Sequence, residues 1–168
     1  MNETITSILN RRSTRKFDVS LKVDSSLIEQ ILEAALWAPC ARGLETTGIY
    51  SIESIERVEE IRKMMEEKDG NDSFYGAKVI ILFTGRKDNL HDIRNASSAI
   101  ENAMIAAESL GVSSCWIHRA CLLNDEKYHD FFKAIGFKDE EEIMGSVILG
   151  YGEKTITKGR NKSFIHRI

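Results

Sequence analysis

The sequence "KVIILFT", residues 78–84, decides the fold. Between its lysine and its threonine every residue is apolar, and most are β-branched. Such a run is typical of a strand that is covered on both faces. We therefore predict that this strand lies in the centre of a sheet.

The next element along the chain is a long helix, predicted over residues 92–110. Its apolar residues recur at helical spacing, and few charges interrupt the rest of its surface. Little of this helix can face water, so it is either the central helix of the domain or part of a subunit interface. The predicted inner face consists of Ala96, Ile100, Ala103, Ala107 and Leu110.

Periodicity predicts the remaining elements around these two. Helices are expected at the N-terminus up to residue 10, over 26–37 with a capping box of Ser26 and Glu29, over 55–68, and over 126–135. The helix over 55–68 directs Ile55, Val58, Ile61 and Met65 inward. Strands are expected at "GIYSI" (48–52), "VSSCWI" (112–117) and "IMGSVILGYG" (143–152). The sum is an α+β or α/β domain on one mixed sheet flanked by helices.

Composition limits the class of protein. A chain of 168 residues with 42% hydrophobic residues and one proline predicts a single domain over residues 1–168. No apolar run approaches the ~18 residues that cross a bilayer, and the N-terminal stretch lacks the pattern of a signal peptide. The three cysteines form no paired framework, which suits a reducing compartment. We predict a cytoplasmic protein without membrane association.

Charge is distributed unevenly along the chain. The formal net charge of −3 argues against a nucleic-acid surface, because such binding needs many unopposed cations. Yet "NRRSTRKF" (10–17) holds three arginines and a lysine, and residues 154–168 hold five cations and no acid. Because termini often meet at a domain surface, the two basic segments are candidates for one anion site. The alternative is that both are solvated faces.

Motif searches mostly exclude functions. The chain contains no P-loop, no complete G-x-G-x-x-G after a strand, no H-E-x-x-H and no G-x-S-x-G. In "CWIHRAC", Cys115, His118 and Cys121 recur at three-residue intervals, as zinc ligands can. No fourth ligand is evident, so buried thiols beside a strand-end histidine are the preferred interpretation and no metal is predicted.

Four segments together resemble a known family. They are "ILNRRSTRKF" (8–17), "AALWAPCARGLETTGIY" (34–50), "AIENAMIAAESLGVSSCWI" (99–117) and "ILGYGEK" (148–154). In this order and spacing they are similar to the FMN-dependent nitroreductase family in its short form, over essentially the whole chain. The resemblance implies an α+β fold and an intertwined homodimer with FMN at the subunit interface. It also implies that NADH or NADPH reduces the flavin and that a nitroaromatic, quinone or similar acceptor reoxidises it by a ping-pong mechanism.

The resemblance assigns roles to the first basic segment. Arg11 would hold the FMN phosphate, Ser13 would bond to the flavin's polar edge or ribityl chain, and Arg15 would lie near N1 and the C2 oxygen. Arg12 matches a basic family position and shares this work. FMN requires cations at two separated points, the phosphate and the ring edge that becomes negative on reduction, so the residue types agree with the cofactor.

The C-terminal basic stretch contributes further candidates. Arg160 matches the family's C-terminal phosphate-binding arginine, and Lys158 is a weaker candidate. For each of these cations, as for the arginines of the first segment, the alternative is a surface ion pair.

The second segment matches a family stretch in which the partner subunit reaches the flavin. The family pattern places a serine after the proline, then an asparagine and a glutamine. Here those three positions are Cys40, Gly43 and Glu45, while Pro39 and Ala41 keep the shape. An ionised Glu45 cannot donate a hydrogen bond, so this flavin contact departs from the family pattern.

In the third segment the family brings backbone groups close to the flavin ring. Ile117 and His118 occupy that stretch, and His118 would offer its backbone N–H to flavin N5 while its ring projects toward substrate. His118 and Arg119 also depart from the family pattern, which commonly has a glycine after the isoleucine. Trp116 is expected to pack in the core, against the far side of the ring.

Three functions remain open on these grounds. The preferred one is a NAD(P)H-dependent flavin oxidoreductase, with no catalytic proton donor nominated and no choice between NADH and NADPH. The second is a flavin-binding or flavin-sensing protein with little reductase activity, motivated by the altered positions Gly43, Glu45, His118 and Arg119. The third is a small anion- or nucleotide-binding module without flavin.

Overall fold

The protein is described by a computed structural model that covers residues 2–154 and 159–168. Its four strands form one sheet in the order β1-β2-β4-β3. The strands are β1 (Gly48–Ile52), β2 (Val79–Arg86), β3 (Ser113–Ile117) and β4 (Glu141–Gly150). The interior position of β2 confirms the prediction made from "KVIILFT".

Pairing within the sheet differs from the mixed sheet that we expected. All three strand pairs are antiparallel. The connection from β1 to β2 stays at one end of the sheet, since Ile52, the last residue of β1, lies opposite Ile80 near the start of β2. Strands β2 and β3 run in the same direction, but β4 lies between them and is antiparallel to both. Among the described residues, parallel pairing occurs at an isolated bridge between Ser13 and Ser114.

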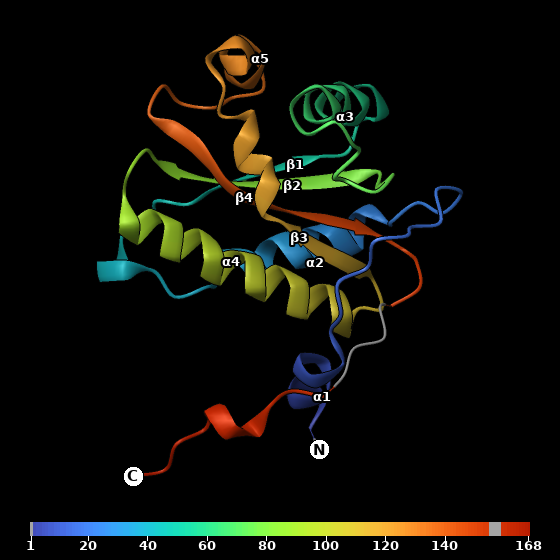
Figure 1. Ribbon diagram of the computed structural model, residues 1–168, viewed down its shortest axis with the longest axis vertical. Helices are drawn as coiled ribbons and strands as arrows, with labels where there is room; N and C mark the ends of the chain where they lie inside the picture. Colours follow the sequence, from blue (N-terminus) through green and yellow to red (C-terminus); the bar gives the residue numbers. More distant parts are fainter. Residues whose placement is uncertain (1, 155–158) are drawn as a thin grey trace.

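Helices cover both faces of the sheet (Figure 1). One face carries α4 (Leu90–Ser109), with α2 (Ser25–Leu36) packed on α4. The other face carries α3 (Ile55–Asp69) and the 3₁₀ helix η2 (His118–Leu123). The remaining helical elements are α1 (Glu3–Asn10), η1 (Ala41–Gly43), η3 (Glu126–Tyr128), α5 (His129–Ala134) and η4 (Lys162–Phe164).

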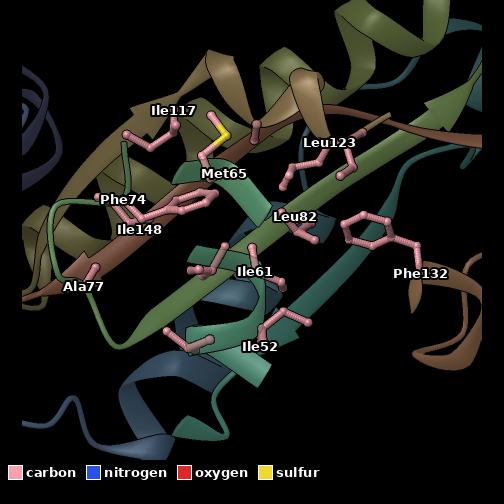
Figure 2. Packing of buried hydrophobic residues seen from close by; sticks show 14 of the residues in the cluster. Ile52, Ile61, Met65, Phe74, Ala77, Leu82, Ile117, Leu123, Phe132 and Ile148 are labelled. Atoms are coloured by element: carbon pink, nitrogen blue, oxygen red, sulfur yellow. The ribbon is translucent and has the colours of Figure 1, made fainter. Parts of the chain in front are cut away.

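The buried strand β2 divides its side chains between two hydrophobic clusters. Ile80 and Leu82 belong to the cluster beneath α3, shown in Figure 2. Val79, Ile81 and Phe83 belong to the cluster beneath α4 and α2. This alternation follows from the two-residue period of a strand, and it explains why the sequence of β2 is apolar throughout.

Two local expectations were wrong. The cap of α2 is Asp24, whose carboxylate accepts a hydrogen bond of 2.8 Å from the amide of Ser26, so the helix starts before the predicted capping box. In α3, Val58, Ile61 and Met65 are buried as predicted, but Ile55 is 50% exposed because it lies in the first turn, outside the contact with the sheet.

No helix within residues 2–154 and 159–168 combines the length and the apolar character that a membrane span requires.

Candidate functional site

The basic segment lies against the edge of the sheet. We call residues 11–15 the basic strip. The amide of Thr14 donates a hydrogen bond of 2.9 Å to the carbonyl oxygen of Ser114 in β3. Beyond the strip, Phe17 forms an antiparallel bridge with Gly152, just after β4. The sheet therefore holds the C-terminal half of the strip and the residue two positions beyond it. That the strip and the basic segment 154–168 share one anion site stays a prediction.

Side chains of the strip fall into two sets. Thr14 is fully buried, whereas its neighbours Ser13 and Arg15 are not. Burial raises the pKa of the Cys115 thiol in β3, and Arg15, a hydrogen bond from Ser13, and Arg11 oppose this rise. Ser13 therefore lies beside β3, and Arg11, Ser13 and Arg15 are alternate residues that an extended backbone would direct to one side of the strip.

Arginines 11 and 12 have different surroundings. The Arg11 side chain is 17% exposed, and its Nε lies 3.7 Å from the Glu101 carboxylate of α4. Arg12 donates from Nη1 to the carbonyl oxygens of Leu9 and Arg11, both at 2.7 Å. Arg12 therefore caps the C-terminal end of α1. Its Nη1 atom is engaged in these two bonds, and the flavin role that we expect for Arg12 stays a prediction.

The backbone after β4 passes so close to the end of the basic strip that position 152 requires a glycine. A Cβ atom on Gly152 would lie 2.1 Å from the Lys16 carbonyl oxygen and 3.0 Å from Thr14 Cγ2. The sequence analysis did not identify this role, although the two glycines of "LGYG" are the signal that points to it.

Beyond Ser114, the outer edge of β3 makes no backbone–backbone hydrogen bond with another described segment, although Cys115 Sγ donates to the Trp116 carbonyl oxygen at 3.7 Å. Because the Ser114 carbonyl points away from β4 toward Thr14, the alternation of an antiparallel strand directs the backbone N–H and C=O of Trp116 to the same edge. Ile117 ends the strand and is buried, and His118 is exposed at the start of η2. The first and third predicted segments are thus neighbours along one edge.

Two side chains near this edge are fixed by packing or pairing. Trp116 is partly buried and packs against the cluster on the α4 side, where a Cβ on Gly145 would lie 2.9 Å from its Nε1 atom, while its predicted contact with the flavin ring stays a prediction. Arg119 pairs with Asp69 at the end of α3, so a carboxylate opposes its charge.

The second predicted segment lines a cavity of about 280 Å³ at the end of α2. Pro39, Cys40 and Glu45 are on its wall, and Trp37 beside them is 80% exposed. Ala41 and Gly43 form the short helix η1 next to it. No residue of the basic strip lines this cavity.

A buried polar chain holds this second segment to α4. The Ala41 amide donates to Asn95 Oδ1 at 2.9 Å, and Asn95 Nδ2 donates to Thr46 Oγ1 at 3.2 Å. The Thr46 hydroxyl in turn donates to Asp92 Oδ1 at 2.8 Å. Asp92 Oδ2 accepts from Arg86 Nε at 2.8 Å and from its amide at 3.0 Å. These hydrogen bonds, those from Arg86 first, lower the pKa of Asp92 to about 2.

Sequence reasoning missed Asp92 and Asn95. The available signal was their spacing of three residues, which puts two polar side chains in line with the apolar face of α4. They are 1% and 5% exposed.

Both segments approach α4, but at different points. Ala41 contacts Asn95, whereas Arg11 approaches Glu101, six residues further along the helix. At 1.5 Å per residue this is about 9 Å along the helix axis. Within one chain, the two predicted sets of residues are not brought into one cavity.

Other predicted residues are located as follows. Lys158 lies outside the described residues, and Arg160 is exposed. The "CWIHRAC" residues do not converge, since no group of three or more His, Cys, Asp or Glu side chains within residues 2–154 and 159–168 is arranged to hold a metal ion.

Comparisons with known proteins address the fold and the family. A protein of Archaeoglobus fulgidus named "Putative NADH dehydrogenase/NAD(P)H nitroreductase" is 26% identical over 156 residues, covering 90% of this chain and 86% of that protein. A nitroreductase structure with bound FMN from Bacteroides fragilis superposes with a TM-score of 0.92 at 23% identity, over 100% of both chains. A second FMN-bound nitroreductase, from Desulfitobacterium hafniense, gives 0.88 at 22% identity over 100% of this chain and 99% of that one.

At these identities the two solved structures establish the fold, and the α+β architecture is confirmed. Family membership rests on a separate finding. The model of the nitroreductase family matches residues 8–151, which is most of the sequence and includes the basic strip, the second segment and all four strands. The chain therefore belongs to the nitroreductase family.

Proposed function

We propose that this protein is an FMN-dependent oxidoreductase that takes electrons from NADH or NADPH and passes them to a nitroaromatic, quinone or similar acceptor. The observation that carries the proposal is the basic strip, which the bridge between Ser13 and Ser114 and the Thr14 hydrogen bond hold against the edge of β3. Arg11, Ser13 and Arg15 occupy alternate positions of this strip. The family match, and the FMN bound in two similar nitroreductase structures, support it.

The strip has the dimensions that the cofactor requires. Arg15 is four residue steps after Arg11, and an extended chain rises about 3.3 Å per residue, so the two positions are about 13 Å apart. That spacing lets one guanidinium hold a phosphate while the other faces a flavin ring edge. Arg11 Nε forms an ion pair of 3.7 Å with Glu101, which is longer than a hydrogen bond, so the guanidinium donors can still turn to a phosphate. The donor set therefore fits FMN.

The residues of this chain bind and orient, because FMN when bound supplies the hydride chemistry. Arg11 would hold the phosphate, Ser13 would bond to the polar edge or the ribityl chain, and Arg15 would stabilise negative charge beside N1 and the C2 oxygen. The outer edge of β3 at Trp116 and the exposed start of η2 at His118 would leave room for the ring along β3. Donor and acceptor would bind in turn, in a ping-pong sequence, over the same exposed face.

We also propose that the protein acts as a homodimer with FMN at the subunit interface. Separation of the basic strip from the Pro39–Glu45 segment along α4 supports this, because a second chain is needed to bring the two sets together. Large apolar side chains exposed beside the cavity support it as well: Trp37 is 80% exposed and Leu36 is 69% exposed.

A purified, yellow protein that releases FMN on denaturation is the first expected result. Anaerobic addition of NADH or NADPH should then bleach the flavin absorbance, and an added quinone should restore it. A colourless protein that takes up no added FMN would contradict the proposal and favour an anion-binding module.

The second candidate, a flavin-binding protein with little reductase activity, is favoured by Glu45 on the cavity wall, where a carboxylate replaces a hydrogen-bond donor. It predicts a yellow protein whose flavin stays oxidised in the presence of either nicotinamide. Glu45→Gln restores the donor, so faster reduction in that variant would support this second function.

A further inference from the structure

The buried polar chain that connects α4 to the second segment has no part in the function described so far. We propose that Asp92 and Asn95 are positioning residues, which act through Thr46 and the Ala41 amide to hold the Ala41–Thr46 segment where it meets the flavin. This inference rests on the proposed function, because it assigns the segment to the FMN site.

Each group in this series of hydrogen bonds has a fixed role as donor or acceptor. Asn95 accepts from the Ala41 amide with Oδ1, so its Nδ2 is left to donate, and Thr46 Oγ1 accepts this bond. The Thr46 hydroxyl must then give its own proton to Asp92. Since Asn95 and Asp92 are 5% and 1% exposed, water offers little compensation for a broken bond. The arrangement therefore admits one orientation of each group.

The second argument is that the segment needs an external anchor. Arg42 has φ of 59°, a left-handed conformation that a residue with a Cβ adopts at a cost, and Gly43 follows with φ of 64°. The Ala41 amide and the Thr46 hydroxyl, which Asn95 holds, lie on either side of these two residues. Asn95 thus fixes both ends of the strained turn.

The third argument concerns Glu45. It is the residue before Thr46, and it lies on the wall of the cavity at the end of α2. A shift of Thr46 away from Asn95 would move Glu45 with it. The position of this carboxylate relative to a bound flavin is therefore set from α4, by residues that do not touch the cofactor.

Thr46→Val tests the inference, because it removes the hydroxyl while keeping the shape of the side chain. Thr46→Ser, which keeps the hydroxyl, is the rescue variant. Thr47→Val is the matched control: it makes the same change one residue along, where the Thr47 hydroxyl is buried without a hydrogen-bond partner among the described residues. Asn95→Ala breaks both bonds to the segment and provides a second variant if Thr46→Val does not fold.

Two quantities are measured on the full chain: hydrogen exchange of the Ala41 amide in the apoprotein, and the dissociation constant for FMN. Thr46→Val and Asn95→Ala should each exchange faster at Ala41 and bind FMN more weakly, by at least about tenfold, the loss expected for one buried hydrogen bond, with the larger loss in Asn95→Ala because it removes two. Thr46→Ser and Thr47→Val should stay within twofold of wild type. At saturating FMN, kcat should change less than the affinity does.

Faster exchange at Ala41 with unchanged FMN affinity in Thr46→Val and Asn95→Ala would show that these residues only stabilise the fold, and it would overturn the inference while leaving the proposed function intact. Wild-type protein that binds no FMN would overturn the proposed function and, with it, the role of the segment. FMN binding by the wild-type protein therefore distinguishes failure of the proposed function from failure of this inference.

Discussion

The amide of Thr14 and the carbonyl oxygen of Ser114 are joined by a hydrogen bond of 2.9 Å, across one hundred residues of sequence. This bond attaches the basic strip to the edge of β3. Since Thr14 is fully buried, its neighbours Ser13 and Arg15 project from a fixed backbone rather than from a mobile N-terminal arm.

Replacing Arg15 should weaken the flavin site. In Arg15→Ala the lost charge-assisted bond should reduce FMN affinity about 10- to 100-fold, or slow reduction of bound flavin comparably. Lys16→Ala is the control, because it removes the same charge from the adjacent exposed position. FMN affinity and reduction rate are measured by titration and stopped flow, and if both stay at wild-type values the role of Arg15 is wrong.

Gly152→Ala should displace the strip without altering any charge. The new Cβ would lie 2.1 Å from the Lys16 carbonyl oxygen, so the backbone of one segment must move. We expect a loss of about 1–3 kcal/mol in the free energy of unfolding, measured with urea, together with weaker FMN binding. Gly159→Ala, where a Cβ meets nothing within 4 Å, should leave both unchanged. Equal stability of the two variants would contradict the described packing.

Asp92 should stabilise the fold in a pH-dependent manner. Its pKa is lowered from 3.8 to about 2, so the ionised form stabilises the folded state above pH 4, and this contribution disappears as the pH falls toward 2. Asp92→Asn should cost about 1–2 kcal/mol in the free energy of unfolding at pH 7, an amount reduced by the partial exposure of Arg86. Urea denaturation of both proteins across pH 7 to 2.5 should show the difference shrinking below pH 4. A constant difference over this range would mean that Asp92 has an ordinary pKa.

Thr84→Val should stabilise the protein. Thr84 in β2 is fully buried, and its hydroxyl has no hydrogen-bond partner among the described residues. Valine has nearly the same shape and buries no polar group, so the free energy of unfolding should rise by about 1 kcal/mol. Destabilisation by a similar amount would show that the hydroxyl is in fact bonded.

Local patterns predicted most of the secondary structure. The apolar run of β2, the helical spacing of α4 and the proline after α2 each act within a few residues, so a sequence is enough to recognise them. The antiparallel direction of the strands was not predictable in the same way. It depends on where each connection returns to the sheet, which no short pattern records.

The residues of the candidate site were likewise predictable only in part. A resemblance was enough to nominate Arg11, Ser13 and Arg15, and the structure places them on one edge, while their contact with FMN stays a prediction. Asp92 and Asn95 were missed because their importance depends on Ala41 and Thr46, 46 to 54 residues away in the chain. Buried polar residues on an apolar helix face are conspicuous only after the partner segment is known.

The bridge between Phe17 and Gly152 also has a consequence for biosynthesis. A ribosome must deliver all four strands before this contact can form, so the basic strip gains its second attachment to the sheet only after β4 has been synthesised. Until then the strip has only its contact with β3, and the cofactor site is incomplete. Maturation with the cofactor is therefore expected to follow translation rather than accompany it.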